Sequence, residues 1–147
     1  MNGLNYKRLL LENDNDVLKI KEVLLLPEVS RFVSISESYF KYVTSTAGVY
    51  FYKVYMKDTL VATTHLEISG SVLYMDVVVF PEYQGKGIGK SIIKDVQNDV
   101  FGLQYDVIEV AIDESNLASL RAFEHSGFRL ASKDGELLNF TYRRKFT

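Results

Sequence analysis

Three glycines stand close together near the middle of the chain, immediately after an apolar stretch. The stretch Val77–Phe80 stops at Pro81, and Gly85, Gly87 and Gly89 follow it. Because glycine has no Cβ, a glycine-rich backbone can come close to a bulky anion. A helix that begins there turns its unpaired N–H groups and a partial positive charge toward the same anion. The spacing therefore predicts a strand, an anion-binding loop and a helix in succession.

The segment after the glycines predicts an amphipathic helix over residues 86–101, ended by a left-handed cap at Gly102. Lys86 and Lys90 place two positive charges beside its first turn. Its apolar stripe, which repeats every four residues, consists of Ile88, Ile92, Val96 and Val100.

Two common phosphate-binding motifs do not match this loop. The P-loop requires Gly-x-x-x-x-Gly-Lys-Ser/Thr. The dinucleotide fingerprint requires Gly-x-Gly-x-x-Gly, whereas Gly85, Gly87 and Gly89 are spaced two apart. The residues from Gln84 to Gly89 instead fit Gln/Arg-x-x-Gly-x-Gly/Ala. With Val79–Tyr83 ahead of it, the stretch resembles the acetyl-CoA signature of the GNAT superfamily of N-acetyltransferases; an ordinary strand-to-helix connection is the alternative.

A second stretch, Asn116–Phe128, strengthens this resemblance. The family commonly shows an asparagine, a short helix and an aromatic residue four positions before Gly-Phe, as Asn116, Phe123 and Gly127 do here. The resemblance implies that acetyl-CoA binds along a strand that splays from its neighbour at a bulge. Strand backbone and Asn116 would hold the pantetheine arm, and loop N–H groups would hold the pyrophosphate. The residues that it assigns to acetyl-CoA are Val77, Val78, Val79, Gln84, Gly85, Lys86, Gly87, Ile88, Gly89, Lys90, Asn116 and Phe123.

Phe123 departs from the family pattern. Many members carry a tyrosine at this position, and its hydroxyl protonates the departing thiolate. Phenylalanine cannot donate a proton, so the sequence predicts a packing role for Phe123 beside the cofactor. A thiol with a pKa of about 8.5 leaves without a dedicated acid. A water or another of the ten tyrosines is the alternative donor.

The reaction also requires a neutral amine. An alkylammonium with a pKa near 10.4 is only about 0.04% deprotonated at pH 7, so a base must remove a proton. Asp76 and Glu109 are the candidate catalytic carboxylates, because each lies in an alternating strand pattern near the expected junction. Glu109 is preferred, since family members often carry a carboxylate on this strand. A structural ion pair is the alternative for each, and Glu67 and Asp113 are weaker candidates.

The surrounding pattern predicts the elements that would position these groups. Their order is β-α-α-β-β-β-α-β-α-β-β, an α/β (α+β) fold with a mixed, mostly antiparallel sheet flanked by helices, which coincides with the GNAT arrangement. The whole chain, residues 1–147, is expected to form one domain. The predicted strands are 6–11, 49–55, 60–68, 72–80, 106–112, 128–132 and 137–143. The predicted helices are 17–24, an ambiguous segment within 28–45, 86–101 and a short helix from 117 that ends at Gly127.

Composition narrows the class of protein. A net charge of −2 gives no reason to expect nucleic-acid or anionic-membrane binding, and no apolar stretch reaches about 18 residues. The start of the sequence lacks signal-peptide features, so a cytoplasmic location is expected. The chain has no cysteine, which excludes an enzyme thioester and favours direct transfer. The two histidines, His65 and His125, are too far apart in sequence to indicate a metal site.

These observations predict an acetyl-CoA-dependent N-acetyltransferase that acts on a primary amine of a small molecule or a peptide. A non-catalytic acyl-CoA-binding module is the main alternative, and a nucleotide-phosphate binder is a weaker one. The aromatic residues within 25–45 could line an acceptor pocket or simply pack in the core. A homodimer is left open.

Overall fold

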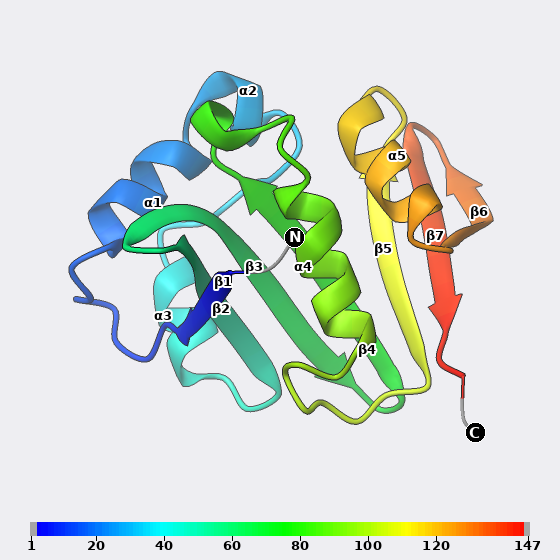
Figure 1. Cartoon of the computed structure of the whole chain (residues 1–147), viewed down its shortest axis with the longest axis horizontal. Coiled ribbons are helices and arrows are strands. Elements are labelled where there is room, and N and C mark those ends of the chain that lie inside the picture. The colour runs from blue at the N-terminus through cyan, green and yellow to red at the C-terminus, as the bar shows by residue number, and fades with distance from the viewer. Residues whose placement is uncertain (1–2, 146–147) are drawn as a thin grey trace.

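The computed structural model describes residues 3–145 and contains one seven-stranded sheet with helices on both faces (Figure 1). The strand order is β1-β2-β3-β4-β5-β7-β6. In chain order the elements are β1 (Leu4–Arg8), α1 (Val17–Leu24), α2 (Pro27–Ser30), α3 (Tyr39–Ser45), β2 (Val49–Met56), β3 (Thr59–Ser69), β4 (Val72–Val79), the 3-10 helix η1 (Pro81–Tyr83), α4 (Ile88–Gln97), β5 (Val107–Asp113), α5 (Leu117–His125), β6 (Arg129–Asp134) and β7 (Leu137–Arg143).

The pairing of β4 with β5 is parallel and short, whereas the other strand pairings described are antiparallel. It runs only from Val72 opposite Val107 to Tyr74 opposite Glu109. Beyond this point the two strands diverge (Figure 1). β4 keeps an unshifted register with β3 through to Val79, so the divergence occurs without the expected bulge in that ladder. The expected mixed, mostly antiparallel sheet is confirmed.

Alternating side chains assign the helices to the two faces of the sheet. Phe51 of β2 packs with α1, α2 and α3 in one core cluster, and Val54 packs with Ile88 of α4 in another. Phe123 of α5 shares a third cluster with Ile93 of α4. Figure 1 shows α4 and α5 in front of the sheet and α3 behind it. The gap between β4 and β5 therefore opens between two helical layers.

The helix after the glycines is shorter at both ends than the sequence predicted. Gly87 has a φ of +81°, so α4 begins at Ile88. Asp99, with a φ of +63°, provides the left-handed cap three residues before Gly102. The Asp99 N–H donates to the Val96 carbonyl, and the Val100 N–H donates to the Asp95 carbonyl. This pair of hydrogen bonds is a Schellman motif. Val100 consequently lies outside the helix and is exposed.

The N-terminal third departs further from the predicted boundaries. The first strand is Leu4–Arg8 rather than residues 6–11, and Leu10 is exposed. Pro27 begins the short helix α2 instead of only ending α1, because proline is well suited to the first helical turn. The ambiguous segment 28–45 contains all of α2 except its first residue and the whole of α3. Among residues 3–145, no helix is long and apolar enough to cross a membrane.

Candidate functional site

The three glycines serve two different structural purposes. Gly85 and Gly87 have φ angles of +78° and +81°, which strain any residue with a side chain. A Cβ added to either would meet nothing within 4 Å, so the loop faces open space. Gly89 has ordinary helical backbone, and its Cβ would lie 3.5 Å from Val79 Cγ2. The first two glycines thus leave room for a ligand, and the third lets α4 pack closely on β4.

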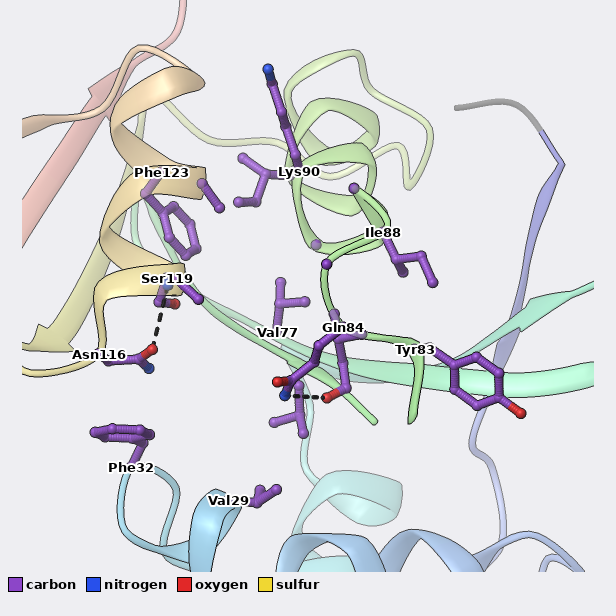
Figure 2. A pocket seen from close by; sticks show the side chains of 18 of the residues that line it. Val29, Phe32, Val77, Tyr83, Gln84, Ile88, Lys90, Asn116, Ser119 and Phe123 are labelled. Carbon is purple, nitrogen blue, oxygen red and sulfur yellow. Dashed lines mark hydrogen bonds between the residues drawn. The ribbon is translucent and has the colours of Figure 1, made fainter. Parts of the chain in front are cut away.

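The N-terminus of α4 presents unused hydrogen-bond donors to that open space. The first helical bond runs from the Ser91 N–H to the Gly87 carbonyl at 3.0 Å, and no side chain caps the helix. The N–H groups of Ile88, Gly89 and Lys90 precede this bond, so the helical ladder does not use them. Together with the helix dipole they suit a pyrophosphate. In Figure 2 the Lys90 side chain extends away from the space beside Gln84.

A cavity of about 370 Å³ connects this loop to the gap between β4 and β5. Its volume lies within the range that small-ligand sites occupy, about 300–1,000 Å³. Its walls come from α2 and the residues after it, the end of β4, the glycine loop, α4 and α5 (Figure 2). The lining residues that the sequence had singled out for acetyl-CoA are Val77, Val78, Val79, Gln84, Gly85, Gly87, Ile88, Gly89, Lys90, Asn116 and Phe123. Lys86 does not line it, and its ammonium lies 5.7 Å from the centre of the Tyr83 ring.

The pleat of β4 decides which backbone groups face the gap. The Phe80 N–H donates to the Val61 carbonyl of β3 at 2.9 Å. Because these groups alternate along an antiparallel ladder, every second residue before Phe80 also points its N–H and C=O groups at β3. Val78 belongs to this set, whereas Val77 and Val79 direct their backbone groups toward β5. The Gln84 side-chain amide donates to the Val79 carbonyl at 3.2 Å. Val77 and Val79 are therefore better placed than Val78 to hydrogen-bond a ligand in the gap.

Asn116 and Phe123 form the α5 wall of the cavity (Figure 2). Asn116 is the N-cap of α5, and its Oδ1 accepts a long hydrogen bond of 3.4 Å from the Ser119 N–H. Phe123 is 2% exposed and packs edge to face on Phe128, with ring centres 5.0 Å apart. The hydroxyl groups among the cavity's lining residues belong to Tyr83 and Ser119. Phe123 has the packing position that the sequence predicted, beside the cavity.

The two candidate catalytic carboxylates lie near the cavity but do not line it. Asp76 shares a face of the sheet with Val78, which lines the cavity from the α1–α3 side. Burial raises the pKa of the Asp76 carboxyl, and the neighbouring His65 opposes that rise. Glu109 is half-buried and lies between Tyr74 of β4 and Thr141 of β7 in the strand register.

The fold also brings together polar residues that the sequence analysis did not connect. His65 lies opposite Asp76 in the β3–β4 register, and its two ring nitrogens contact Tyr39 of α3 and Glu67 of β3. His65 and Glu67 are two residues apart on one strand and therefore share a face, and this spacing is the signal that could have connected them. Their contact with α3 depends on helix packing, which no local pattern shows.

Comparisons with known proteins agree with this architecture. Residues 19–128 match the model of the Acetyltransferase (GNAT) family. A search of curated protein sequences finds no significant match. Spermidine N-acetyltransferase from Vibrio cholerae, solved with CoA and spermine, superposes with a TM-score of 0.82 at 15% identity, covering 98% of this chain and 97% of the other. N-acetyltransferase PseH from Campylobacter jejuni, solved with acetyl coenzyme A, gives 0.77 at 12% identity, covering 97% and 99%. A domain from Methanocaldococcus jannaschii gives 0.80 at 16% identity, covering 95% and 97%.

Proposed function

The chain belongs to the GNAT acetyltransferase family and is an acyltransferase with acetyl-CoA as its donor, and from this premise we propose that it acetylates a primary amine of a small molecule by direct transfer. The structural neighbours named above include an enzyme solved with the polyamine spermine. Family membership favours an enzyme over the non-catalytic acyl-CoA-binding module.

One observation carries the proposal: the cavity reaches from the glycine loop to the opposite face of the sheet. Gly85 and Gly87 line it on the side of α4, and Glu28, Phe32 and Val33 line it on the side of α1–α3. A donor bound along the loop and an acceptor entering between the helices of the other layer would meet in the gap. Such a meeting of both substrates is what direct transfer requires.

The geometry of the loop and the gap supports an assignment of the donor-binding residues. The N–H groups at the start of α4 would hold the pyrophosphate, and the free backbone groups of Val77 would hold the pantetheine arm. Asn116 lies across the cavity with an amide that its long cap bond does not saturate. When bound, acetyl-CoA supplies the acetyl thioester that the amine attacks. Phe123 contributes a buried apolar ring to the wall of the cavity.

Asp76 is the carboxylate that we assign to deprotonation of the acceptor. It lies on β4 beyond the last pair with β5, one pleat or about 7 Å from Val78. Its raised pKa brings the carboxyl closer to neutral pH, which is favourable for a general base. Asp76, Glu67 and Glu109 also give this face of the sheet negative charge, which attracts an ammonium-bearing acceptor.

An acceptor screen tests the proposal. Purified protein is incubated with acetyl-CoA and polyamines, aminoglycosides, amino sugars or short peptides, and released CoA is measured with a thiol dye. The protein contributes no signal because it has no cysteine. We expect CoA release above hydrolysis with at least one small amine, and acetylated product by mass spectrometry. Release with peptides alone would move the acceptor class to peptides, and no release with any amine would refute the activity.

A further inference from the structure

A chain of hydrogen-bonded side chains connects α3 to the sheet face that carries Asp76. The Tyr39 hydroxyl lies 2.8 Å from His65 Nδ1, and His65 Nε2 lies 3.1 Å from Glu67 Oε1. The Tyr42 hydroxyl donates to the same Glu67 oxygen at 2.8 Å. The acetyl-CoA site does not use these four side chains, and they do not line its cavity.

The partners of His65 determine the direction in which the chain donates. An ionised Glu67 can only accept, so Nε2 of His65 carries the hydrogen of that bond. Nδ1 of the neutral ring is then an acceptor, and the Tyr39 hydroxyl donates to it. Each bond holds one proton, and each proton points from Tyr39 toward Glu67. This is the arrangement that allows protons to move in sequence along a chain.

The chain runs from the interior of the protein toward its surface. The Tyr39 ring packs edge to face against Phe51 of the core, whereas the side chains of His65 and Glu67 are 15% and 35% exposed. Burial and the charges of Asp76 and Glu67 raise the pKa of the Tyr39 hydroxyl. Tyr39 therefore stays protonated at neutral pH and can accept a proton only while it passes its own to His65.

The inner end of the chain lies near Asp76, since the charge of Asp76 raises the pKa of the Tyr39 hydroxyl. His65 and Asp76 form a directly opposed pair, at about 5.5 Å between Cα atoms for a hydrogen-bonded pair. The groups that face the His65 ring are Tyr39 and Tyr42 from α3, Glu67 from its own strand and Asp76 from β4. Phe51 is its apolar neighbour on β2.

We propose that Tyr39, His65 and Glu67 conduct to solvent the proton that the acceptor ammonium loses to Asp76. This inference rests on the proposed function. An N–H bond of the ammonium breaks as Asp76 takes the proton, and Asp76 then gives that proton to the Tyr39 oxygen. The Tyr39 proton moves to Nδ1 of His65, the Nε2 proton moves to Glu67, and Glu67 releases it to water. Asp76 is again ionised, and exchange of the imidazole protons with water restores the first tautomer.

The test compares two acceptors that differ in their need for deprotonation. One is the best alkylamine from the screen, which is protonated at pH 7. The other is its analogue with a trifluoromethyl group on the carbon that carries the amine, because this group withdraws enough electron density to leave the amine mostly neutral at pH 7. For His65→Gln we expect kcat/KM with the alkylamine to fall by about tenfold or more, a smaller effect than the roughly 10²–10⁴-fold of the base itself. We expect kcat/KM with the fluorinated amine to stay within about twofold. Raising the pH should restore part of the alkylamine rate.

Two further variants make the result decisive. Tyr39→Phe keeps the ring in the core and should reproduce the selective loss even if His65→Gln folds poorly. Tyr74→Phe is the matched control, because Tyr74 is an exposed tyrosine opposite Glu67 and outside the chain, and it should change neither rate. An equal loss with both acceptors, or no loss with either, would overturn the proton path. Absence of turnover by the unmodified protein would instead refute the proposed function, and the path with it.

Discussion

Asp76 and Glu109 lie on the same face of the sheet but on different sides of the point where β4 and β5 separate. Glu109 is opposite Tyr74 in the last pair of the parallel ladder, and Asp76 is two residues farther along β4. Glu109 is therefore enclosed by ladders with β4 and β7, whereas Asp76 lies at the open gap. For this reason we propose Asp76 as the base, whereas the sequence favoured Glu109, and the catalytic role of each carboxylate stays a prediction.

Asp76→Asn should lower kcat/KM for an alkylamine acceptor by roughly 10²–10⁴-fold, the usual size of general-base catalysis. The acidic limb of the pH–rate profile should flatten with it. Glu109→Gln is the matched control, since it removes one charge from the same face, and its rate should stay within about threefold. The measurement is steady-state CoA release with both substrates varied. A larger loss of kcat/KM in Glu109→Gln than in Asp76→Asn would assign the catalytic role to Glu109 of β5.

The same Asp76→Asn change should stabilise the protein at neutral pH. Burial raises the folded-state pKa of Asp76 above its usual 3.8, so the folded state binds the proton more tightly than the unfolded state. Ionisation of Asp76 thus lowers stability as pH rises through this pKa, and asparagine avoids the loss. Thermal melts at pH 7 should show a higher Tm for the variant, and the advantage should shrink as the pH falls toward about 4. A lower Tm at pH 7 would contradict the raised pKa.

Gly87→Val should weaken acetyl-CoA binding by at least about tenfold, or about 1.4 kcal/mol, because the new side chain would fill the open space in front of the loop. The positive φ of Gly87 adds backbone strain, which a control must separate. Gly70→Val supplies this control, since Gly70 has a φ of +61° and equally open surroundings in the β3–β4 turn. Calorimetry should show a binding loss only for Gly87→Val, with similar losses of stability in the two variants.

The Asn116→Ala change tests whether the Asn116 side chain caps α5, hydrogen-bonds acetyl-CoA, or does both. A lost hydrogen bond to acetyl-CoA should raise the Kd by an amount worth about 0.5–1.5 kcal/mol. A lost helix cap should lower stability, here toward the low end of about 0.5–2 kcal/mol because the cap bond is 3.4 Å long. Asn116→Asp keeps a capping oxygen but has no amide donor, so it should preserve stability better than binding. A loss of stability without a change in Kd would show that Asn116 acts only as a helix cap.

Phe123→Tyr should place a hydroxyl at the cavity wall, in the position of the tyrosine that the family resemblance implies. We expect several-fold higher turnover and nearly unchanged CoA affinity, less than the roughly 10²–10⁴-fold of a fully positioned acid. Phe128→Tyr is the control, because Phe128 packs on Phe123 without lining the cavity. Steady-state rates and CoA titrations of both variants give the comparison. Equal rates in a folded Phe123→Tyr protein would show that another donor or water protonates the thiolate.

The sequence by itself determined the elements with strong local signals. These elements are the glycines of the loop, the alternating strands β2 to β4, and the turn between the predicted strands 128–132 and 137–143, where Gly135 has a φ of +62°. They depend on side-chain period and on φ, which neighbouring residues fix. The segment between Pro27 and Ser45 lacked such a signal, and its division into α2 and α3 follows from packing on the sheet.

Only the tertiary structure decided which polar groups meet. The point where β4 leaves β5 depends on pairing between distant segments, and this point distinguishes Asp76 from Glu109. The direction of each backbone group in β4 depends on its register with β3, which separates Val77 from Val78. The contact of Tyr39 with His65 joins a helix to a strand 26 residues away. Local periodicity contains no information about such contacts, because they form only when the helices pack on the completed sheet.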